Sequence, residues 1–246
     1  MGRTSAELKR VSRENLMGHW GLAIGASLLS ALIVSAALTP FFFLMVASRN
    51  GAVQSVAYVL AVLILGMVSV VMQCGILKMH LAFSRRANAD LKMMFGEFTR
   101  RPERYVLAYL MVLGISVPCM LPGGICAIVA AEGGTVLAGV ISLLLYLAGL
   151  IVLMAVVLRY SLVFLLLADD SQMNAVEAFR ESARRMEGNK GRMFYIYLSF
   201  LGWGVLGMLS CGIGMLWIIP YMNQVTVNFY HDVSAEPEQD EMFDMM

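Results

Sequence analysis

The sequence predicts an all-α, polytopic membrane protein: a helix bundle of six transmembrane helices in three hairpins, each preceded by a short basic amphipathic helix. Composition is the first reason, since 59% of the 246 residues are hydrophobic and 14% are charged, against roughly 25% charged residues in soluble domains. The second reason is that the charges gather in three blocks. The third is that the stretches between the blocks are long enough for helices to cross a hydrocarbon core of about 30 Å.

Backbone polar groups in lipid must be satisfied within the chain, so each long apolar stretch is interpreted as a helix. We expect spans at about 20–47, 52–79, 105–131, 135–168, 193–210 and 213–230. Glycine-containing breaks close the hairpins at Arg49-Asn50-Gly51, Glu132-Gly133-Gly134 and Cys211-Gly212. The last two segments could instead form a re-entrant hairpin, which would leave four spans. Residues 1–231 then make one transmembrane domain, and the acidic segment 232–246 is expected to be a disordered tail.

The three polar blocks predict amphipathic helices. In the second block the apolar positions follow helical spacing and end before Pro102: Leu91, Met94, Phe95 and Phe98. The third block, 171–187, follows the capping candidates Asp170 and Ser171, and its apolar stripe is Met173, Val176, Phe179, Ala183 and Met186. The first block, 5–17, has Leu8 and Val11 on its apolar face. Such helices lie in the membrane interface, or they pack against the end of the bundle.

Two basic-to-apolar boundaries are similar in sequence. Aligning 12–24 with 182–194 superposes Ser12 on Ser182, Leu16 on Met186, Gly18 on Gly188, Gly21 on Gly191 and Ile24 on Phe194. The match indicates either a duplication or two independent sequences that suit the same boundary between a basic helix and a span.

The basic residues give the orientation. In the six-span arrangement four, seven and five Lys and Arg residues fall in the three blocks on one side, Arg49 falls on the other side, and Arg159 remains within a span. Positively charged loops stay in the cytoplasm. The sequence therefore predicts a multi-pass protein with both termini in the cytoplasm.

Several motifs resemble those of a bacterial membrane-protein family known as domain of unknown function 975. They are Gly188-Asn189-Lys190-Gly191, Trp203, Trp217 and Pro220-Tyr221, with Gly18-His19-Trp20-Gly21 near the N-terminus. The chain has His19 where the family usually has Asn, and Glu187 where Lys is more usual. The resemblance implies the bacterial cytoplasmic (inner) membrane as the location, but no established activity. A more distant similarity to membrane regions of glycerophosphodiester phosphodiesterases implies a lipid-related or envelope role without catalytic residues.

Arg159 is the candidate functional residue inside a span, because charge at the bilayer centre costs about 2.5 to 3.5 kcal/mol. With Gln73, Asn223, Gln224 and Asn228, and with His80 nearby, it could line a polar pocket that opens to the cytoplasm. The alternatives are a side chain that extends to the headgroups and ordinary hydrogen bonds between helices.

Catalytic and metal motifs are absent from the sequence, so we expect no enzyme and no cofactor. The three histidines are isolated, the four cysteines lack paired spacing, and no Asp or Glu lies inside a predicted span. Proline and glycine at 118–124 and 211–220 predict broken helices, which occur in transporters.

The favoured function is a non-enzymatic protein that organises or senses membrane lipid, or a membrane-protein partner. The expected lipid partners are anionic headgroups of the cytoplasmic leaflet, and nucleic-acid binding is not expected. A channel or transporter with a polar cavity facing the cytoplasm is one alternative. Self-protection against membrane-active peptides is another.

Overall fold

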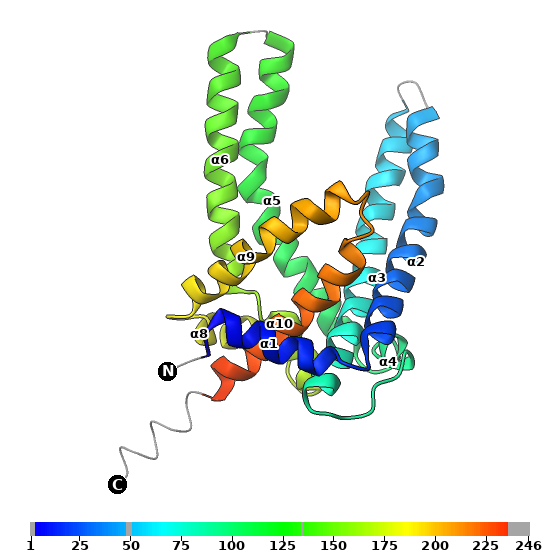
Figure 1. Cartoon of the computed structure of the whole chain (residues 1–246). Helices are drawn as coiled ribbons and strands as arrows, with labels where there is room; N and C mark the ends of the chain where they lie inside the picture. Colours follow the sequence, from blue (N-terminus) through cyan, green and yellow to red (C-terminus); the bar gives the residue numbers. More distant parts are fainter. Residues whose placement is uncertain (1–2, 48–50, 134, 236–246) are drawn as a thin grey trace.

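The computed structural model describes residues 3–47, 51–133 and 135–235, and the regular secondary structure within these ranges is entirely α-helical (Figure 1). The helices in chain order are α1 (Ser5–Leu16), α2 (Trp20–Ala47), α3 (Ala52–Ser84), α4 (Lys92–Gly96), α5 (Pro102–Gly133), α6 (Val136–Arg159), α7 (Val163–Asp169), α8 (Ala175–Arg185), α9 (Lys190–Leu209) and α10 (Met215–Ala235). The all-α prediction is confirmed for the described residues.

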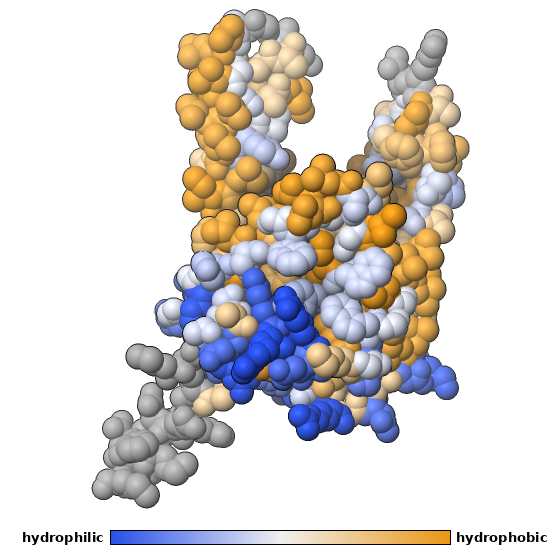
Figure 2. Space-filling model, in the orientation of Figure 1, coloured by the Kyte–Doolittle hydropathy of each residue, from blue (hydrophilic) through white to orange (hydrophobic). Residues whose placement is uncertain are grey.

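Two long hairpins, α2–α3 and α5–α6, stand as separate arms on a common base (Figure 1). The base consists of α1, α4, α7 and α8 with the adjoining ends of α3, α5 and α10. Hydrophobic residues cover the arms, whereas hydrophilic residues gather on the base (Figure 2). An apolar surface of this extent is stable in contact with lipid rather than water.

Five helical segments among the described residues are long and apolar enough to cross a membrane. They are Trp20–Ala47, Ala52–Ser84, Pro102–Ala131, Val136–Asp169 and Lys190–Leu209. The predicted sixth span at 213–230 is not among them. It corresponds to α10, whose middle carries the polar residues Asn223, Gln224 and Asn228. The membrane-protein prediction is therefore confirmed, but a regular set of six spans is not.

The third hairpin, α9–α10, leans between the arms, and its turn stops well short of their far ends (Figure 1). The turn begins at Cys211, which has a φ of 54°, and continues through Gly212 with a φ of 85°. The side chains next to the turn are apolar and exposed: Met208 is 74% exposed and Leu209 is 76% exposed. This geometry favours the re-entrant alternative for the last hairpin.

The fourth predicted span, 135–168, is not one helix. It breaks after Arg159 at Tyr160–Leu162, and α7 then runs through the base. The break is held by Ser182 of α8, whose hydroxyl donates to the Arg159 carbonyl oxygen at 3.1 Å and accepts from the Leu162 backbone N–H at 3.3 Å. A partner outside the span thus satisfies the backbone groups that the break exposes.

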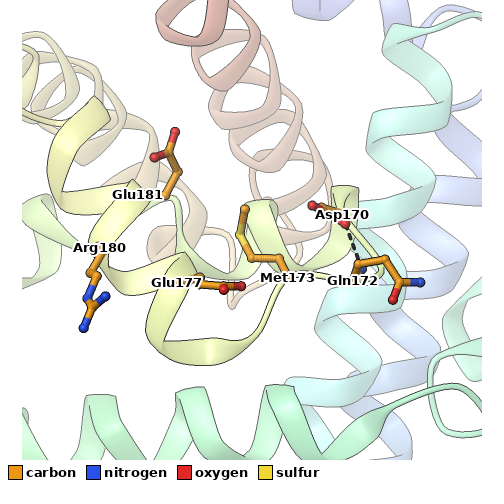
Figure 3. A pocket seen from close by; sticks show the side chains of 6 residues that line it. All are labelled: Asp170, Gln172, Met173, Glu177, Arg180 and Glu181. Atoms are coloured by element: carbon orange, nitrogen blue, oxygen red, sulfur yellow. Dashed lines mark hydrogen bonds between the residues drawn. The ribbon is translucent and has the colours of Figure 1, made fainter.

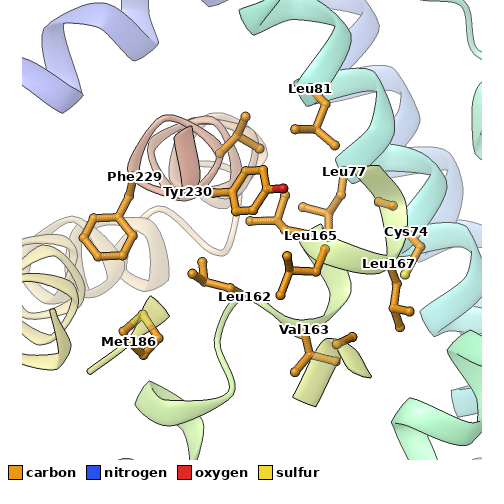
Figure 4. Packing of buried hydrophobic residues seen from close by; sticks show 14 of the residues in the cluster. Cys74, Leu77, Leu81, Leu162, Val163, Leu165, Leu167, Met186, Phe229 and Tyr230 are labelled. Atoms are coloured by element: carbon orange, nitrogen blue, oxygen red, sulfur yellow. The ribbon is translucent and has the colours of Figure 1, made fainter. Parts of the chain in front are cut away.

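The core of the base forms around α7. Leu165 and Leu167 of α7 are buried in one hydrophobic cluster that also contains Leu77 of α3 and Tyr230 of α10 (Figure 4). This explains why 163–168 is apolar enough to resemble the end of a span: the segment is buried in protein.

The predicted break at 118–124 is wrong, because α5 continues through Pro118 and Pro122 to Gly133. Close packing against α6 supports the helix there. A Cβ added at Gly149 of α6 would lie 2.3 Å from the Cys119 carbonyl oxygen. Tertiary contact thus outweighs the local effect of the two prolines.

The amphipathic helices pack on the base, and parts of their predicted registers are wrong. α8 is capped by Asn174 rather than Asp170 or Ser171, and it buries Ala175, Ala178, Phe179 and Ser182 while Val176 is exposed. α1 buries Leu8, Ser12 and Leu16 against α10, α3 and α9. The second block forms only the short α4, with Met94 buried and Phe95 and Phe98 exposed. Their buried faces contact protein, which favours packing against the end of the bundle for α1 and α8.

The sequence similarity between the two boundaries corresponds to a local structural repeat. Gly18 and Gly188 have φ angles of 81° and 78°, and Ser12 and Ser182 are both buried. The alignment also pairs the two capping boxes. Thr4 and Glu7 form one at the start of α1, and the aligned residues Asn174 and Glu177 form the other at the start of α8. The unit of helix, glycine turn and second helix therefore occurs twice.

The tail prediction applies only in part to the described residues. α10 continues to Ala235, so 232–235 are helical. The rest of the predicted tail, and the Arg49-Asn50 and Gly134 positions of the predicted turns, lie outside the described residues.

Accessibility of Cys211 tests the placement of the third hairpin. In a variant with Cys74, Cys119 and Cys126 replaced by Ala, we expect Cys211 to react with a membrane-impermeant maleimide from neither side of the membrane, because its apolar surroundings place it in the hydrocarbon region. A Val136→Cys control in a chain with no other cysteine should react from the non-cytoplasmic side. If Cys211 reacts from that side as fast as the control, the hairpin crosses completely.

Candidate functional site

Polar side chains of α3 and α10 meet where these helices enter the base. The His80 Nδ1 and Gln224 Oε1 atoms lie 2.9 Å apart, and both side chains are fully buried. Within the described residues, His80 Nε2 and Gln224 Nε2 have no hydrogen-bond partner. The Asn223 Nδ2 atom is also buried and unpartnered there.

Asn228 joins α10 to α1. Its Nδ2 donates to the Ser12 hydroxyl at 2.8 Å, and its Oδ1 accepts from Asn15 Nδ2 at 3.1 Å. Because Gln224 and Asn228 are buried, their side chains connect helices and do not face an open cavity. Gln73 lies half-buried on α3.

Arg159 is placed apart from these residues. Its side chain is exposed, and its guanidinium carbon lies 5.9 Å from the centroid of the Tyr160 ring. Among the described residues, no hydrogen bond or ion pair links it to Gln73, Asn223, Gln224 or Asn228. Of the predicted pocket residues, the structure thus joins His80 of α3 to Gln224 of α10, whereas Asn228 contacts α1 and Arg159 lies apart.

A buried ionic cluster, which the sequence did not reveal, holds the base together. Glu97 is 2% exposed and Arg104 is 4% exposed. Glu97 Oε1 accepts from Lys78 Nζ at 2.8 Å, and Glu97 Oε2 accepts from the Tyr105 hydroxyl at 2.5 Å. Arg104 lies 3.8 Å from the same carboxylate and donates to the Tyr105 hydroxyl and to the Asp170 carbonyl oxygen. The cluster therefore connects α3, α5 and the α7–α8 connection.

The electrostatics of the cluster favour an ionised Glu97. Burial alone would raise the pKa of this carboxyl group. The hydrogen bonds from Lys78 and Tyr105, and the charges of Lys78 and Arg100, outweigh burial and lower the pKa below its usual value. One feature of the sequence could have indicated this cluster. Lys78 lies near the end of an apolar span, where a charged side chain is stabilised by a nearby carboxylate.

The motif residues of the family resemblance fall in two places. Gly188 and Asn189 form the turn between α8 and α9, where Asn189 Nδ2 donates to the Arg185 carbonyl oxygen and Asn189 Oδ1 accepts from Arg192. Lys190 and Gly191 begin α9. Trp203, Trp217 and Tyr221 line one groove together with Trp20, and Pro220 lies within α10 beside it.

The sequence profile described as "Protein of unknown function (DUF975)" matches residues 1–237. The chain belongs to this family. No curated protein matches the chain, and no solved structure matches the chain. The family assignment supplies no activity, so the site must be interpreted from its own geometry.

The acidic residues of this DUF975 protein do not form a metal centre among the described residues. A hollow of about 400 Å³ is lined by Asp170, Gln172, Met173, Glu177, Arg180 and Glu181. Figure 3 shows the three carboxylates pointing in different directions. Each also has a local role: Asp170 accepts from the Gln172 N–H, Glu177 completes the α8 capping box, and Glu181 pairs with Arg184 and Arg185.

Glu97→Gln tests the buried cluster. We expect a loss of about 3 kcal/mol of stability, because removing one partner leaves the buried Arg104 charge uncompensated. The measurement is thermal or denaturant unfolding of the purified protein in mild detergent. Glu103→Gln is the matched control, since Glu103 is an exposed acid paired with Arg101 and should cost less than about 1 kcal/mol. Equal effects of the two substitutions would contradict this role for Glu97.

The same cluster predicts a pH dependence. A carboxyl group whose folded-state pKa is lowered contributes stability above its unfolded-state pKa, about 4.3 for Glu, and loses this contribution as the pH falls through the folded-state value. Wild-type stability should therefore decline below about pH 4 more steeply than that of Glu97→Gln. Parallel pH profiles of the two proteins would exclude this contribution.

Proposed function

We propose that this protein is a non-enzymatic, multi-pass protein of the bacterial cytoplasmic membrane whose base binds anionic lipid headgroups of the cytoplasmic leaflet, and so organises or senses lipid there. The observation that carries the proposal is the separation of surfaces in Figure 2, with apolar arms on one side and a hydrophilic base on the other. The positive-inside rule places the base in the cytoplasm.

The base displays cations that its own acids do not neutralise. Several Lys and Arg residues make no ion pair among the described residues: Lys9, Arg13, Arg86, Lys92, Arg100, Arg180 and Lys190. Each such cation near an anionic leaflet contributes about 1 kcal/mol of attraction.

The cations are presented on a fixed surface. α1 and α8 bury their apolar faces in the base, so their charged faces keep their positions. A fixed arrangement of cations loses little conformational freedom when it contacts headgroups, which favours binding.

The histidines support a non-enzymatic role, since each is engaged in structural contacts, and His19 and His80 both contact the Phe83 ring. His19 stacks on Phe83 with ring centroids 4.8 Å apart, His80 pairs with Gln224, and His231 Nε2 lies 2.9 Å from the Ser84 hydroxyl oxygen. The channel or transporter alternative has less support, because Gln224 and Asn228 are buried and Arg159 is apart from them.

Lipid analysis tests the proposal. After gentle extraction from membranes that contain phosphatidylglycerol and phosphatidylethanolamine, we expect native mass spectrometry to find the anionic lipid enriched on the protein. Replacing Lys92, Arg100 and Arg180 together by Gln should lower this enrichment by about fivefold per cation, or about a hundredfold in all, because about 1 kcal/mol of attraction is lost with each.

The control replaces two exposed arginines that already pair with carboxylates, Arg101 and Arg184, by Gln. This double substitution should change the enrichment of the anionic lipid less than the substitution of Lys92, Arg100 and Arg180 does. A wild-type protein that carries the two lipids in proportion to their abundance would refute headgroup binding.

A further inference from the structure

An aromatic groove of about 260 Å³ opens between α1, α2, α9 and α10. Arg13 lines it, and its other walls are Trp20, Phe200, Trp203, Trp217, Ile218 and Tyr221. These walls include all three tryptophans of the chain. In Figure 2 residues of intermediate hydropathy lie between the hydrophilic base and the apolar arms. Trp and Tyr in such a belt sit at the level of lipid headgroups.

Two cations of α1 are held over the walls of the groove. Arg13 Nε donates to the Tyr221 hydroxyl at 3.2 Å, and its guanidinium carbon lies 5.6 Å from the centroid of the Tyr221 ring. Lys9 Nζ lies 5.1 Å from the centroid of the Phe200 ring. The Tyr221 hydroxyl in turn donates to the Lys9 carbonyl oxygen at 3.2 Å. These contacts fix both positive charges beside an apolar space.

The two charges lack a counterion. Neither Lys9 nor Arg13 forms an ion pair among the described residues, whereas Arg10 on the same helix lies 4.0 Å from Glu14. The pKa of Lys9 is lowered, first by burial and second by the Arg13 charge. Two neighbouring cations that repel each other make a favourable place for an anion.

We propose that the groove binds one acyl chain of an anionic phospholipid, whose phosphate is bound by Lys9 and Arg13. This inference rests on the proposed function and gives it a specific site. Apart from Arg13, the residues that line the groove are aromatic or aliphatic, and Trp203 and Trp217 are each 51% exposed. A lipid can cover both the cations and this surface, whereas a soluble anion would leave the apolar walls open.

The size of the groove agrees with one chain. Pockets that enclose a whole small molecule measure about 300–1,000 Å³, and this groove is smaller. The rest of the lipid would remain in the bilayer, which costs less than extracting the whole molecule.

Tryptophan fluorescence provides the test, because all the tryptophans line the groove. The full chain is reconstituted in nanodiscs of phosphatidylcholine containing increasing fractions of brominated phosphatidylglycerol or, separately, brominated phosphatidylcholine of the same chain length. Bromine quenches tryptophan on contact. We expect half-maximal quenching at an about 25-fold lower fraction of phosphatidylglycerol than of phosphatidylcholine, because two cations each contribute about fivefold.

Replacing both Lys9 and Arg13 by Gln should remove this preference, with a loss of about fivefold per cation. The charge-retaining pair Lys9→Arg and Arg13→Lys should keep it, which separates loss of charge from loss of fold. Arg10→Gln is the matched control on the same helix and should also keep the preference.

Three outcomes overturn the site. The first is an unchanged preference in the Gln pair, the second is a loss in the charge-retaining pair as full as in the Gln pair, and the third is a reduction by Arg10→Gln as large as that of the Gln pair. If the enrichment seen by mass spectrometry persists in any of these cases, the base still binds anionic lipid and only the groove is refuted. If wild type shows neither quenching preference nor enrichment, both proposals fall.

Discussion

A buried carboxylate needs partners, and the base of this protein is organised around that need. Glu97 takes its partners from both arms: Lys78 belongs to α3, and Tyr105 and Arg104 belong to α5. A Cβ added at Gly75 would lie 2.6 Å from the Met94 Cα atom, so α4 packs directly on α3 and positions the acid beside Lys78. Leaving any one of these charges unpaired in the interior would be costly, which fixes the two arms relative to each other at their lower ends.

The arms owe their separation to the same arrangement. Each hairpin packs mainly on itself, and the arms contact each other in the base, where α3 meets α5 and α7 packs against both. Figure 1 shows α9 and α10 leaning across the opening above. The third hairpin therefore packs on the inner side of an open frame and leaves its aromatic residues beside α1.

Features that depend on local composition could be predicted from the sequence. The long apolar runs and the formation of helices in the first and third blocks follow from residues close together in the chain. The break at Tyr160–Leu162 could not be predicted, since the hydroxyl that stabilises it comes from Ser182. The register of α8 was wrong for a related reason: α8 packs against α7, and it buries Ala178 and Ser182 while Val176 is exposed.

The candidate site was only partly predictable. Hydrogen bonds between helices were one alternative for Gln224 and Asn228, and in the structure Gln224 contacts His80 of α3, whereas Asn228 contacts Ser12 and Asn15 of α1. Arg159 was grouped with them on the assumption of a straight fourth span, and the turn after α6 removes the basis for that grouping. The cluster of Glu97 was missed because its members are separated in sequence and resemble ordinary charges of a polar loop.

The two copies of the repeat bear on whether the cations of α1 are needed for folding. With Ser12 aligned to Ser182, Lys9 corresponds to Phe179 and Arg13 corresponds to Ala183. In α8, Phe179 is buried, with its ring centroid 4.9 Å from that of Tyr160. The same unit of capping box, buried serine and glycine turn is thus built with apolar residues at these two positions. Since the unit does not require cations there, Lys9 and Arg13 are best explained by what they face, which is the aromatic groove and the membrane beyond it.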